Sequence, residues 1–260
     1  MENQSQPPQA NKTSNQKWII LGVGGGCALI AAIIVIAALI LADFGPAIGK
    51  TFNSVSVNPN IAAQVTDTPQ SNMANVVMPP SRNHPQANDN KMGDPNAPVK
   101  IVEYADFQCP YCMQYWQETE PQIIQNYVAT GKVYYEYHSV GGFIGPESAD
   151  AADAAYCAAD QNKFWEYHDM LFANWTGENA GDFTPDKLRQ YAAAVHLDLN
   201  RFDTCLNVGA NTDRVNQDVS DAKAAGVHAT PSFVINGKLV EGAQPYSVFQ
   251  QAINAALNGQ

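Results

Sequence analysis

Two cysteines that flank a proline–tyrosine pair, Cys109-Pro110-Tyr111-Cys112, constrain this chain more than any other feature. Pro110 suits the first position of a helix, so Cys109 is expected at the helix N-terminus. The free N–H groups and the dipole at that end favour an anion, and a thiolate there has a pKa below the usual value of about 8.5. Cys112 lies on the same helical face, about 5–6 Å away, which suits a disulfide. The spacing predicts a redox-active pair in which Cys109 is the exposed, attacked sulfur and Cys112 the more buried one.

Two other interpretations of this pair, a zinc site and a purely structural disulfide, fit the sequence less well. A zinc site needs two further ligands, usually from a second close pair, whereas Cys157 and Cys205 lie far apart in the sequence. The loop closed by a CxxC disulfide is so short that it adds little chain-entropy stabilisation. We therefore expect neither a bound metal nor a dissociable cofactor, since the redox group is the Cys109–Cys112 pair itself.

An apolar run without charges, residues 18–42, determines where these cysteines act. A membrane-spanning helix needs about 20 apolar residues, whereas the apolar core of a cleaved signal peptide has about 7–15. This favours an uncleaved anchor in the lipid bilayer, although ALILADFG also resembles a cleavage site. Lys12 and Lys17 precede the run and Asp43 follows it, so the positive-inside rule places residues 1–17 in the cytoplasm and the rest outside. Disulfides persist on that side.

The rest of the chain divides by composition into a linker and a folded domain. Residues 43–92 are rich in Asn, Pro, Ser and Gln and bury too little apolar area to order themselves. We expect a flexible linker here, in which short runs such as ANVVM dock on the domain that residues 93–260 form. The net charge of -11 and the pI of about 4.7 argue against nucleic acid as a partner, because phosphate binding needs a basic surface.

The order of the expected elements indicates an α/β fold. PVKIVEYADF and KVYYEYHSV predict strands on either side of a helix that begins at Pro110, is kinked at Pro121 and ends at Gly131. A helical block over about 143–226 follows, and PSFVINGKLVEG predicts a hairpin that turns at Asn236–Gly237 before a closing helix. A β-α-β unit and a β-β-α unit make a mixed sheet with helices on its faces. The helical block is then an insertion between the two halves.

The segments GDPNAPVKIVEYADFQCPYC and HATPSFVINGKLVEG, with the helical block between them, resemble the DsbA-like branch of the thioredoxin superfamily, and within it the membrane-tethered thiol–disulfide oxidoreductases. The resemblance implies a thioredoxin fold with a helical insertion domain, in which Cys109 is the nucleophile. It also implies a substrate-binding surface made of Thr230, Pro231, Pro110 and Tyr111. In this surface Pro231 is a cis-proline beside the disulfide, and Thr230 offers backbone groups to an extended substrate peptide.

Glu103 matches the buried catalytic acid that lies beneath the cysteines in this family. A carboxyl at that place takes protons from Cys112 and has a pKa raised by desolvation. The alternative, a surface residue of the strand, is disfavoured because the strand is otherwise mostly apolar. The chain departs from the best-known oxidases of the family, which carry Pro-His between the cysteines. Tyr111 lacks the imidazolium that helps to hold a thiolate, and this leaves the redox potential open.

The resemblance implies a dithiol oxidase that introduces disulfides into secreted or envelope proteins, on the extracytoplasmic side of a bacterial cell membrane. Its partners are then unfolded or reduced secreted proteins and, by family analogy, a quinone-linked membrane protein that reoxidises it. Two alternatives stay open: a disulfide reductase or isomerase with the same site, and a tethered chaperone-like binding module with a static disulfide. Cys157 and Cys205, both in the helical block, are expected to form a structural disulfide, the alternative being two buried thiols.

Overall fold

The structure is a computed structural model that describes residues 75–259. The expected cytoplasmic segment (1–17), the membrane anchor (18–42) and most of the expected linker (43–92) lie outside these residues. Among the helices of the described part, none is both long and apolar enough to cross a bilayer.

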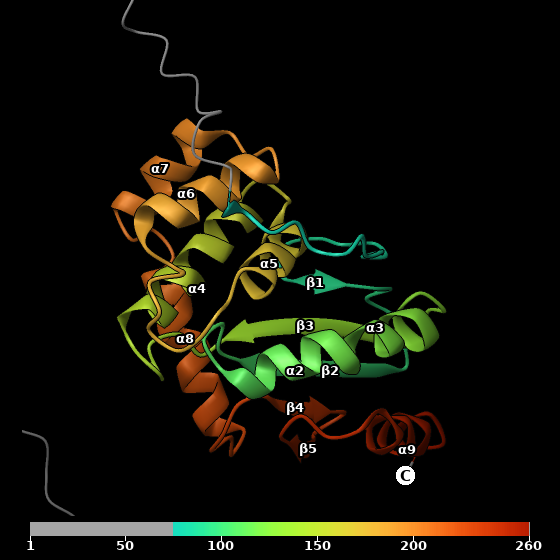
Figure 1. The fold of residues 1–260 in the computed structure, drawn as a ribbon. Helices are drawn as coiled ribbons and strands as arrows, with labels where there is room; N and C mark the ends of the chain where they lie inside the picture. Colours follow the sequence, from blue (N-terminus) through green and yellow to red (C-terminus); the bar gives the residue numbers. More distant parts are fainter. Residues whose placement is uncertain (1–74, 260) are drawn as a thin grey trace, which may run out of the picture. The chain divides into compact units, whose positions relative to one another are not determined.

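A five-stranded mixed sheet forms the centre of the described part (Figure 1). Its strand order is β1-β3-β2-β4-β5. β2 and β3 are parallel, and the other neighbouring strands are antiparallel. The strands are β1 (Lys91–Met92), β2 (Val99–Ala105), β3 (Val133–Ser139), β4 (Ser232–Ile235) and β5 (Lys238–Glu241).

Two groups of helices accompany the sheet. Those next to the strands in the sequence are α2 (Pro110–Glu118), α3 (Glu120–Ile123), the π-helical turn η3 (Ile124–Val128) and α9 (Tyr246–Leu257). The expected insertion between β3 and β4 contains α4 (Pro146–Ala159), α5 (Phe164–Ala173), α6 (Pro185–Ala194), α7 (Leu199–Asn207) and α8 (Thr212–Ala224). Within it, α6 and α7 lie farthest from the sheet (Figure 1).

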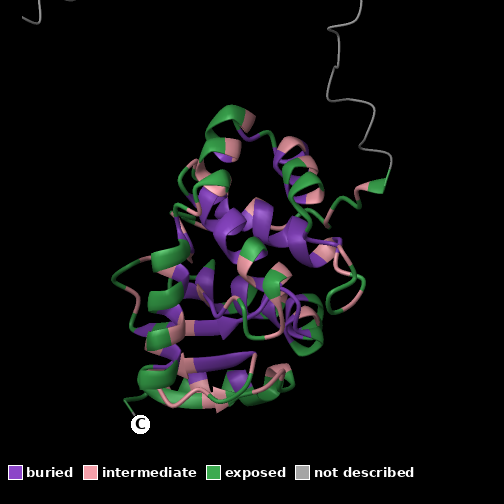
Figure 2. Ribbon diagram, turned by 90° about the vertical axis from the view of Figure 1, so that its left-hand side faces the viewer, coloured by how far each residue is buried: buried purple, intermediate pink, exposed green. Residues whose placement is uncertain are grey.

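One face of the sheet carries the side chains that matter for the site. Strand pairing places Glu103 of β2 opposite Tyr137 of β3 and Phe233 of β4, so all three share this face. Tyr115 of α2 packs on Phe233, and Trp165 of α5 packs on Tyr137. The other face is covered by α8. Buried residues gather in the sheet and on the helix surfaces that face it (Figure 2).

The expected continuous helix after the cysteines is interrupted. α2 ends at Glu118, and α3 begins at Glu120 with Pro121 in its first turn. Because a proline has no N–H to donate and its ring excludes the carbonyl of the preceding turn, the regular helix is interrupted next to Pro121, where a kink was expected. Gly131 then adopts a φ of 73°, a left-handed conformation that suits glycine.

The predicted hairpin between β4 and β5 is confirmed. Asn236 and Gly237 form its turn, with φ values of 44° and 84°. Two consecutive positive φ values are typical of the turn whose twist matches that of the flanking strands.

Residues 75–92, which we call the N-terminal segment, lie in the expected linker and pack on the domain, as was expected there of the run ANVVM. The side chain of Asn174, at the end of α5, forms two hydrogen bonds of 2.8 Å with the backbone of Val77. At the other end of the segment, Lys91 of β1 pairs with Glu136 of β3. Val77 belongs to the run ANVVM, whose docking was expected, whereas composition does not reveal that the rest of the segment packs as well.

A disulfide joins Cys157 of α4 to Cys205 of α7, with the two Cα atoms 5.8 Å apart. The cysteines of the helical block are therefore paired in the structure and are not free thiols. The bond connects the first helix of the insertion to its fourth.

Candidate redox site

The turn between β2 and α2 holds Cys109 in a fixed position. It is closed by hydrogen bonds from the Cys109 N–H to the Asp106 carbonyl (3.0 Å) and from the Gln108 N–H to the Asp106 carboxylate (2.8 Å). Cys109 keeps an extended backbone while its carbonyl accepts a hydrogen bond from the Met113 N–H (3.1 Å), which starts the helix. Pro110 occupies the beginning of the helix, as its ring geometry predicts. The sulfur is thus anchored from both the strand and the helix.

Both cysteines of the pair are free thiols, and both are buried. The exposed fraction is 5% for Cys109 and 1% for Cys112, so Cys109 is less exposed than predicted. The reason is the loop before β4, which contacts Cys109: in the protonated form, the Cys109 Sγ donates a hydrogen bond to the Thr230 carbonyl (3.3 Å). The two residues that follow Cys109 in the sequence are exposed instead: Pro110 is exposed, and Tyr111 is 62% exposed.

The loop before β4 brings Thr230 and Pro231 next to the cysteine pair, and the peptide bond between them is cis. The Pro231 carbonyl accepts a hydrogen bond from the Gly242 N–H (2.7 Å), and the Ser232 hydroxyl donates one to the Ala229 carbonyl (2.7 Å). Thr230 is half-buried, and Pro231 is buried. The structure thus brings together the cysteines and the loop residues that the sequence singled out.

The two thiols differ in pKa. A hydrogen bond from the Cys112 thiol lowers the pKa of Cys109 from 9.0 to about 6, against the effect of burial, and the backbone N–H groups of Cys112 and Tyr111 act in the same direction. Burial raises the pKa of Cys112 well above its ordinary value, and its hydrogen bond to Cys109 raises it further. At neutral pH the pair therefore consists of one thiolate, at Cys109, and one thiol, at Cys112.

Titration of the reduced protein is expected to show the Cys109 thiolate forming with a midpoint near pH 6. The ultraviolet absorbance of the thiolate measures it, and Cys109→Ser serves as the blank for other thiols. In Cys112→Ala the hydrogen bond to the Cys109 sulfur is lost, so the midpoint is expected to rise toward the pKa of free cysteine, about 8.5. A wild-type midpoint already at that value contradicts the asymmetric pair.

Glu103 lies in the middle of β2 and is 2% exposed, so it is not a surface residue of the strand. Desolvation raises its pKa from 4.5 to about 8, while the Tyr135 hydroxyl, which donates a hydrogen bond to Glu103 Oε2 (2.6 Å), opposes this shift. The charge of Glu103 in turn raises the pKa of Cys112, so the two groups lie within electrostatic reach of each other. At neutral pH the carboxyl is mostly protonated and has a proton to give.

Sequence reasoning missed a second group of buried polar side chains next to this site. Glu120, His168 and Asp169 place ligand-type atoms within 4.8 Å of one another. Arg82 pairs with Glu120 at 2.7 Å, and the Trp116 indole N–H donates to Asp169 at 2.8 Å. Since protein donors already occupy these carboxylates, the group is an ion-pair network and not a metal site. Its cation comes from the segment whose composition predicted a linker, and therefore no local signal in the sequence announces it.

In a comparison with known protein families, a family model described as Thioredoxin matches residues 86–255. Together with the mixed sheet and its helices, this confirms the predicted thioredoxin fold. Two curated relatives are Na(+)/H(+) antiporter NhaA 3 of Salinispora tropica, 38% identical over 170 residues, and Na(+)/H(+) antiporter NhaA 1 of Mycobacterium sp. (strain KMS), 32% identical over 169 residues. The alignments cover 65% and 64% of this chain but only 24% and 26% of the relatives. The chain thus spans about a quarter of the length of the curated relatives it matches.

Three solved structures resemble the described part. BdbD from Bacillus subtilis superposes with a TM-score of 0.62 at 23% identity, covering 70% of this chain and 99% of BdbD, which speaks for the fold alone. Wolbachia pipientis α-DsbA1 has a TM-score of 0.57 and 26% identity, with coverages of 68% and 94%. A thioredoxin-like oxidoreductase from Silicibacter pomeroyi has a TM-score of 0.55 and 28% identity, with coverages of 65% and 91%.

Proposed function

The chain belongs to the thioredoxin family, and we propose that it is a thiol–disulfide oxidoreductase whose working pair is Cys109 and Cys112. The observation that carries this proposal is the difference between the two thiols. Cys109 has a lowered pKa and lies next to the exposed Tyr111, whereas Cys112 has a raised pKa and lies within electrostatic reach of the buried Glu103. The similarity to α-DsbA1 and to a thioredoxin-like oxidoreductase supports a general oxidoreductase role.

In our proposal the enzyme acts as a dithiol oxidase. A thiolate with a pKa of about 6 is a stabilised form of the reduced protein, and the corresponding disulfide is therefore a stronger oxidant of other thiols. This stabilisation of the reduced protein is fully present above the ordinary pKa of a thiol, and it is lost as the pH falls through about 6, where Cys109 becomes protonated. Oxidation of clients at neutral pH is thus favoured over reduction.

The reaction balances in two exchanges. A client thiolate attacks the Cys109 sulfur, the Cys109–Cys112 bond breaks, and Cys112 leaves as a thiolate that takes the proton of Glu103. A second client thiolate then attacks the client sulfur of the mixed disulfide, so Cys109 leaves as a thiolate and the client keeps the new disulfide. Two electrons have passed from the client to the pair, and a quinone-linked membrane protein is the proposed acceptor that removes them again.

The proposed client-binding surface surrounds Cys109. Pro110 and Tyr111 form its exposed side at the start of α2. Thr230 and Pro231 form the other side, where the half-buried backbone of the loop suits the main chain of an extended peptide. A client cysteine in an unfolded chain can reach the sulfur between these two sides, whereas a cysteine inside a folded domain cannot.

We further propose that the enzyme is anchored in a bacterial cell membrane by residues 18–42 and that its domain lies on the extracytoplasmic side. The apolar run and the lysines that precede it support the anchor. The Cys157–Cys205 disulfide supports the location, because structural disulfides persist in oxidising compartments.

The reduction potential of the Cys109–Cys112 couple, measured against glutathione, tests the proposed direction. We expect a value above about −200 mV, on the oxidising side of the glutaredoxins. A potential near that of thioredoxin, about −270 mV, contradicts the oxidase and favours a reductase. Refolding of clients by a Cys109→Ala, Cys112→Ala double variant as efficiently as by the wild type instead favours a binding module without redox chemistry.

A further inference from the structure

A second buried carboxyl, Glu120, lies close to the cysteine helix. It is 1% exposed and stands at the start of α3. Arg82 of the N-terminal segment reaches it, with 2.7 Å between Arg82 Nη1 and Glu120 Oε2, and the arginine side chain is itself only 9% exposed. The guanidinium also lies over the ring of Trp116, 4.2 Å from its centroid. Since Trp116 follows Cys112 by one turn of α2, the ion pair is packed against the helix that carries the cysteines.

Buried side chains connect this ion pair to Glu103 from the β3 side. The Tyr135 hydroxyl donates to Glu103 and lies 3.1 Å from the Tyr115 hydroxyl of α2. Both tyrosines are at most 1% exposed. Burial raises the pKa of each tyrosine well above its ordinary value, and the charges of Glu103 and Glu120 raise it further, so the tyrosine pair lies within electrostatic reach of both acids.

A second connection runs through α5. The ring of His168 packs edge-on against Tyr137, with 5.0 Å between the ring centroids, and Tyr137 is the strand partner of Glu103. His168 Nε2 lies 3.9 Å from Glu120 Oε1. His168 and Tyr137 are both at most 1% exposed. In a region with this little water, charges act on one another over longer distances than at a surface.

We infer that the Arg82–Glu120 ion pair is a positioning element of the cysteine site, one that sets how readily Glu103 gives up and regains the proton exchanged with Cys112. The inference rests on the proposed function for its chemistry. An ionised Glu120 disfavours a second negative charge at Glu103, and Arg82 balances that charge. Arg82 lies before residue 86, where the family match begins. The N-terminal segment thereby contributes to the site although the matched region does not include this arginine.

Several charged and titratable groups face the two acids, and all belong to the same buried layer. Those around Glu120 are Arg82 and His84 of the N-terminal segment and His168 and Asp169 of α5. Those around Glu103 are Cys112 and Tyr115 of α2 and Tyr135 and Tyr137 of β3.

The pKa directions agree with a shared charge balance in this layer. Burial and the charges of Asp169 and Glu103 raise the pKa of Glu120, whereas Arg82, whose Nη1 lies 2.7 Å from Glu120 Oε2, lowers it and stabilises the ionised carboxylate. Burial lowers the pKa of His168, so this side chain is neutral at neutral pH and does not replace the arginine. Arg82 is therefore the permanent positive charge beside Glu120.

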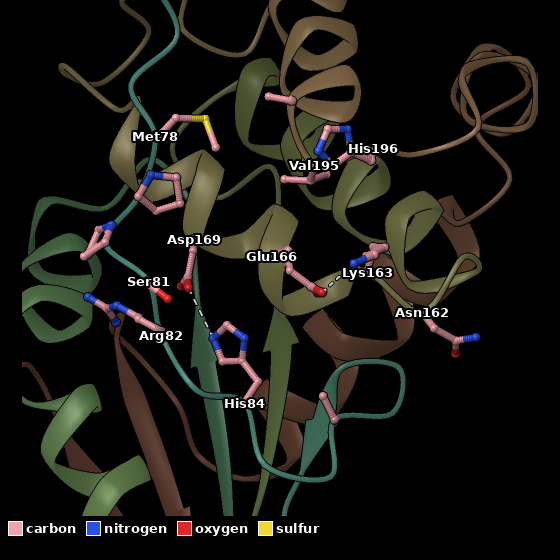
Figure 3. A pocket seen from close by; sticks show the side chains of 14 residues that line it. Met78, Ser81, Arg82, His84, Asn162, Lys163, Glu166, Asp169, Val195 and His196 are labelled. Carbon is pink, nitrogen blue, oxygen red and sulfur yellow. Dashed lines mark hydrogen bonds and ion pairs between the residues drawn. The ribbon is translucent and has the colours of Figure 1, made fainter.

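The network also borders solvent. A cavity of about 620 Å³ lies between the N-terminal segment and α5, and Arg82, His84 and Asp169 line it (Figure 3). In the wall of this cavity His84 points toward Asp169, with 3.2 Å between His84 Nε2 and Asp169 Oδ2 (Figure 3).

Direct titration of Glu103 tests the inference. Carbon NMR of glutamate labelled at the side-chain carboxyl, in the reduced full chain, follows each acid, and Glu103→Gln assigns the signal. In Glu120→Gln the Arg82 charge is left unbalanced, so the pKa of Glu103 is expected to fall by about 1 unit from its value of about 8. The matched control is Glu118→Gln, an exposed acid two positions away in the sequence, which is expected to leave the titration unchanged.

Adding Arg82→Gln to Glu120→Gln is expected to reverse most of the shift, because the unbalanced cation is removed as well. Should Glu120→Gln fail to fold, Glu120→Ala removes the same charge and is expected to move Glu103 in the same direction. An unchanged Glu103 titration in the folded Glu120 variant overturns the inference.

Activity separates this inference from the proposed function. If the wild type exchanges disulfides and the Glu103 titration moves as expected, the pH profile of the reduction potential should move with it. If the wild type exchanges none, the proposed function fails while the NMR titration still decides the coupling between the acids. If exchange is normal and the titration does not move, only the positioning role is overturned.

Discussion

Replacement of Cys109 with serine is expected to abolish thiol–disulfide exchange, with a loss on the order of 10³-fold or more, as is typical when an enzyme loses its nucleophile. The physical reason is that Cys112 cannot take over the attack. It is 1% exposed, and burial keeps it protonated at neutral pH. Reactivation of reduced, denatured ribonuclease measures the loss, and circular dichroism checks that the variant is folded.

Cys112→Ser is the matched control for this experiment. It keeps the attacking sulfur of Cys109 but removes the Cys112 thiol, which resolves a mixed disulfide. We expect it to form a stable covalent complex with a disulfide-containing client, visible on a non-reducing gel, whereas Cys109→Ser forms none. A complex with Cys109→Ser but not with Cys112→Ser reverses the roles of the two sulfurs.

Removal of the second disulfide, in a Cys157→Ala, Cys205→Ala double variant, is expected to lower the free energy of unfolding by about 3–4 kcal/mol. The bond closes a loop of 48 residues between α4 and α7. Without it, the unfolded chain gains the conformational freedom of that loop, whereas the native contacts of the two helices stay the same. Urea unfolding monitored by tryptophan fluorescence measures the difference, provided that the transition is two-state.

Two observations separate a structural from a catalytic disulfide in this variant. The specific rate of client oxidation below the unfolding transition should equal that of the wild type, because Cys157 and Cys205 lie in α4 and α7 and are not part of the proposed client-binding surface. A reductant should lower the free energy of unfolding of the wild type to about that of the variant, and it should leave the stability of the variant unchanged. A stability loss below about 1 kcal/mol means that the loop is already constrained in the unfolded chain.

Local patterns in the sequence predicted most of what defines the site. The Cys-Pro-Tyr-Cys spacing places both sulfurs at the start of one helix, and the apolar strand around Glu103 indicates a buried acid. The positive φ values that Asn236–Gly237 favours give the hairpin. Each of these signals lies within a few residues, where backbone geometry and burial patterns determine the outcome.

The features that sequence reasoning did not predict depend on contacts between distant residues. Cys109 is more buried than expected because Thr230 contacts it from a loop near the other end of the domain. The pairing of Arg82 with Glu120 depends on where the N-terminal segment crosses α2 and α3. Composition alone assigns that segment to a linker, because no periodic apolar pattern shows that it will be packed.

The shortness of the outermost strands has a consequence for a protein that meets unfolded chains. A long, unpaired sheet margin invites such chains to add further strands and to aggregate on it. Here β1 has only two residues, and β5 has four and carries Lys238 and Glu241 at its ends. An extended client therefore finds little free backbone on which to build a β-ladder, so a client released by the second thiol exchange is free to leave and fold.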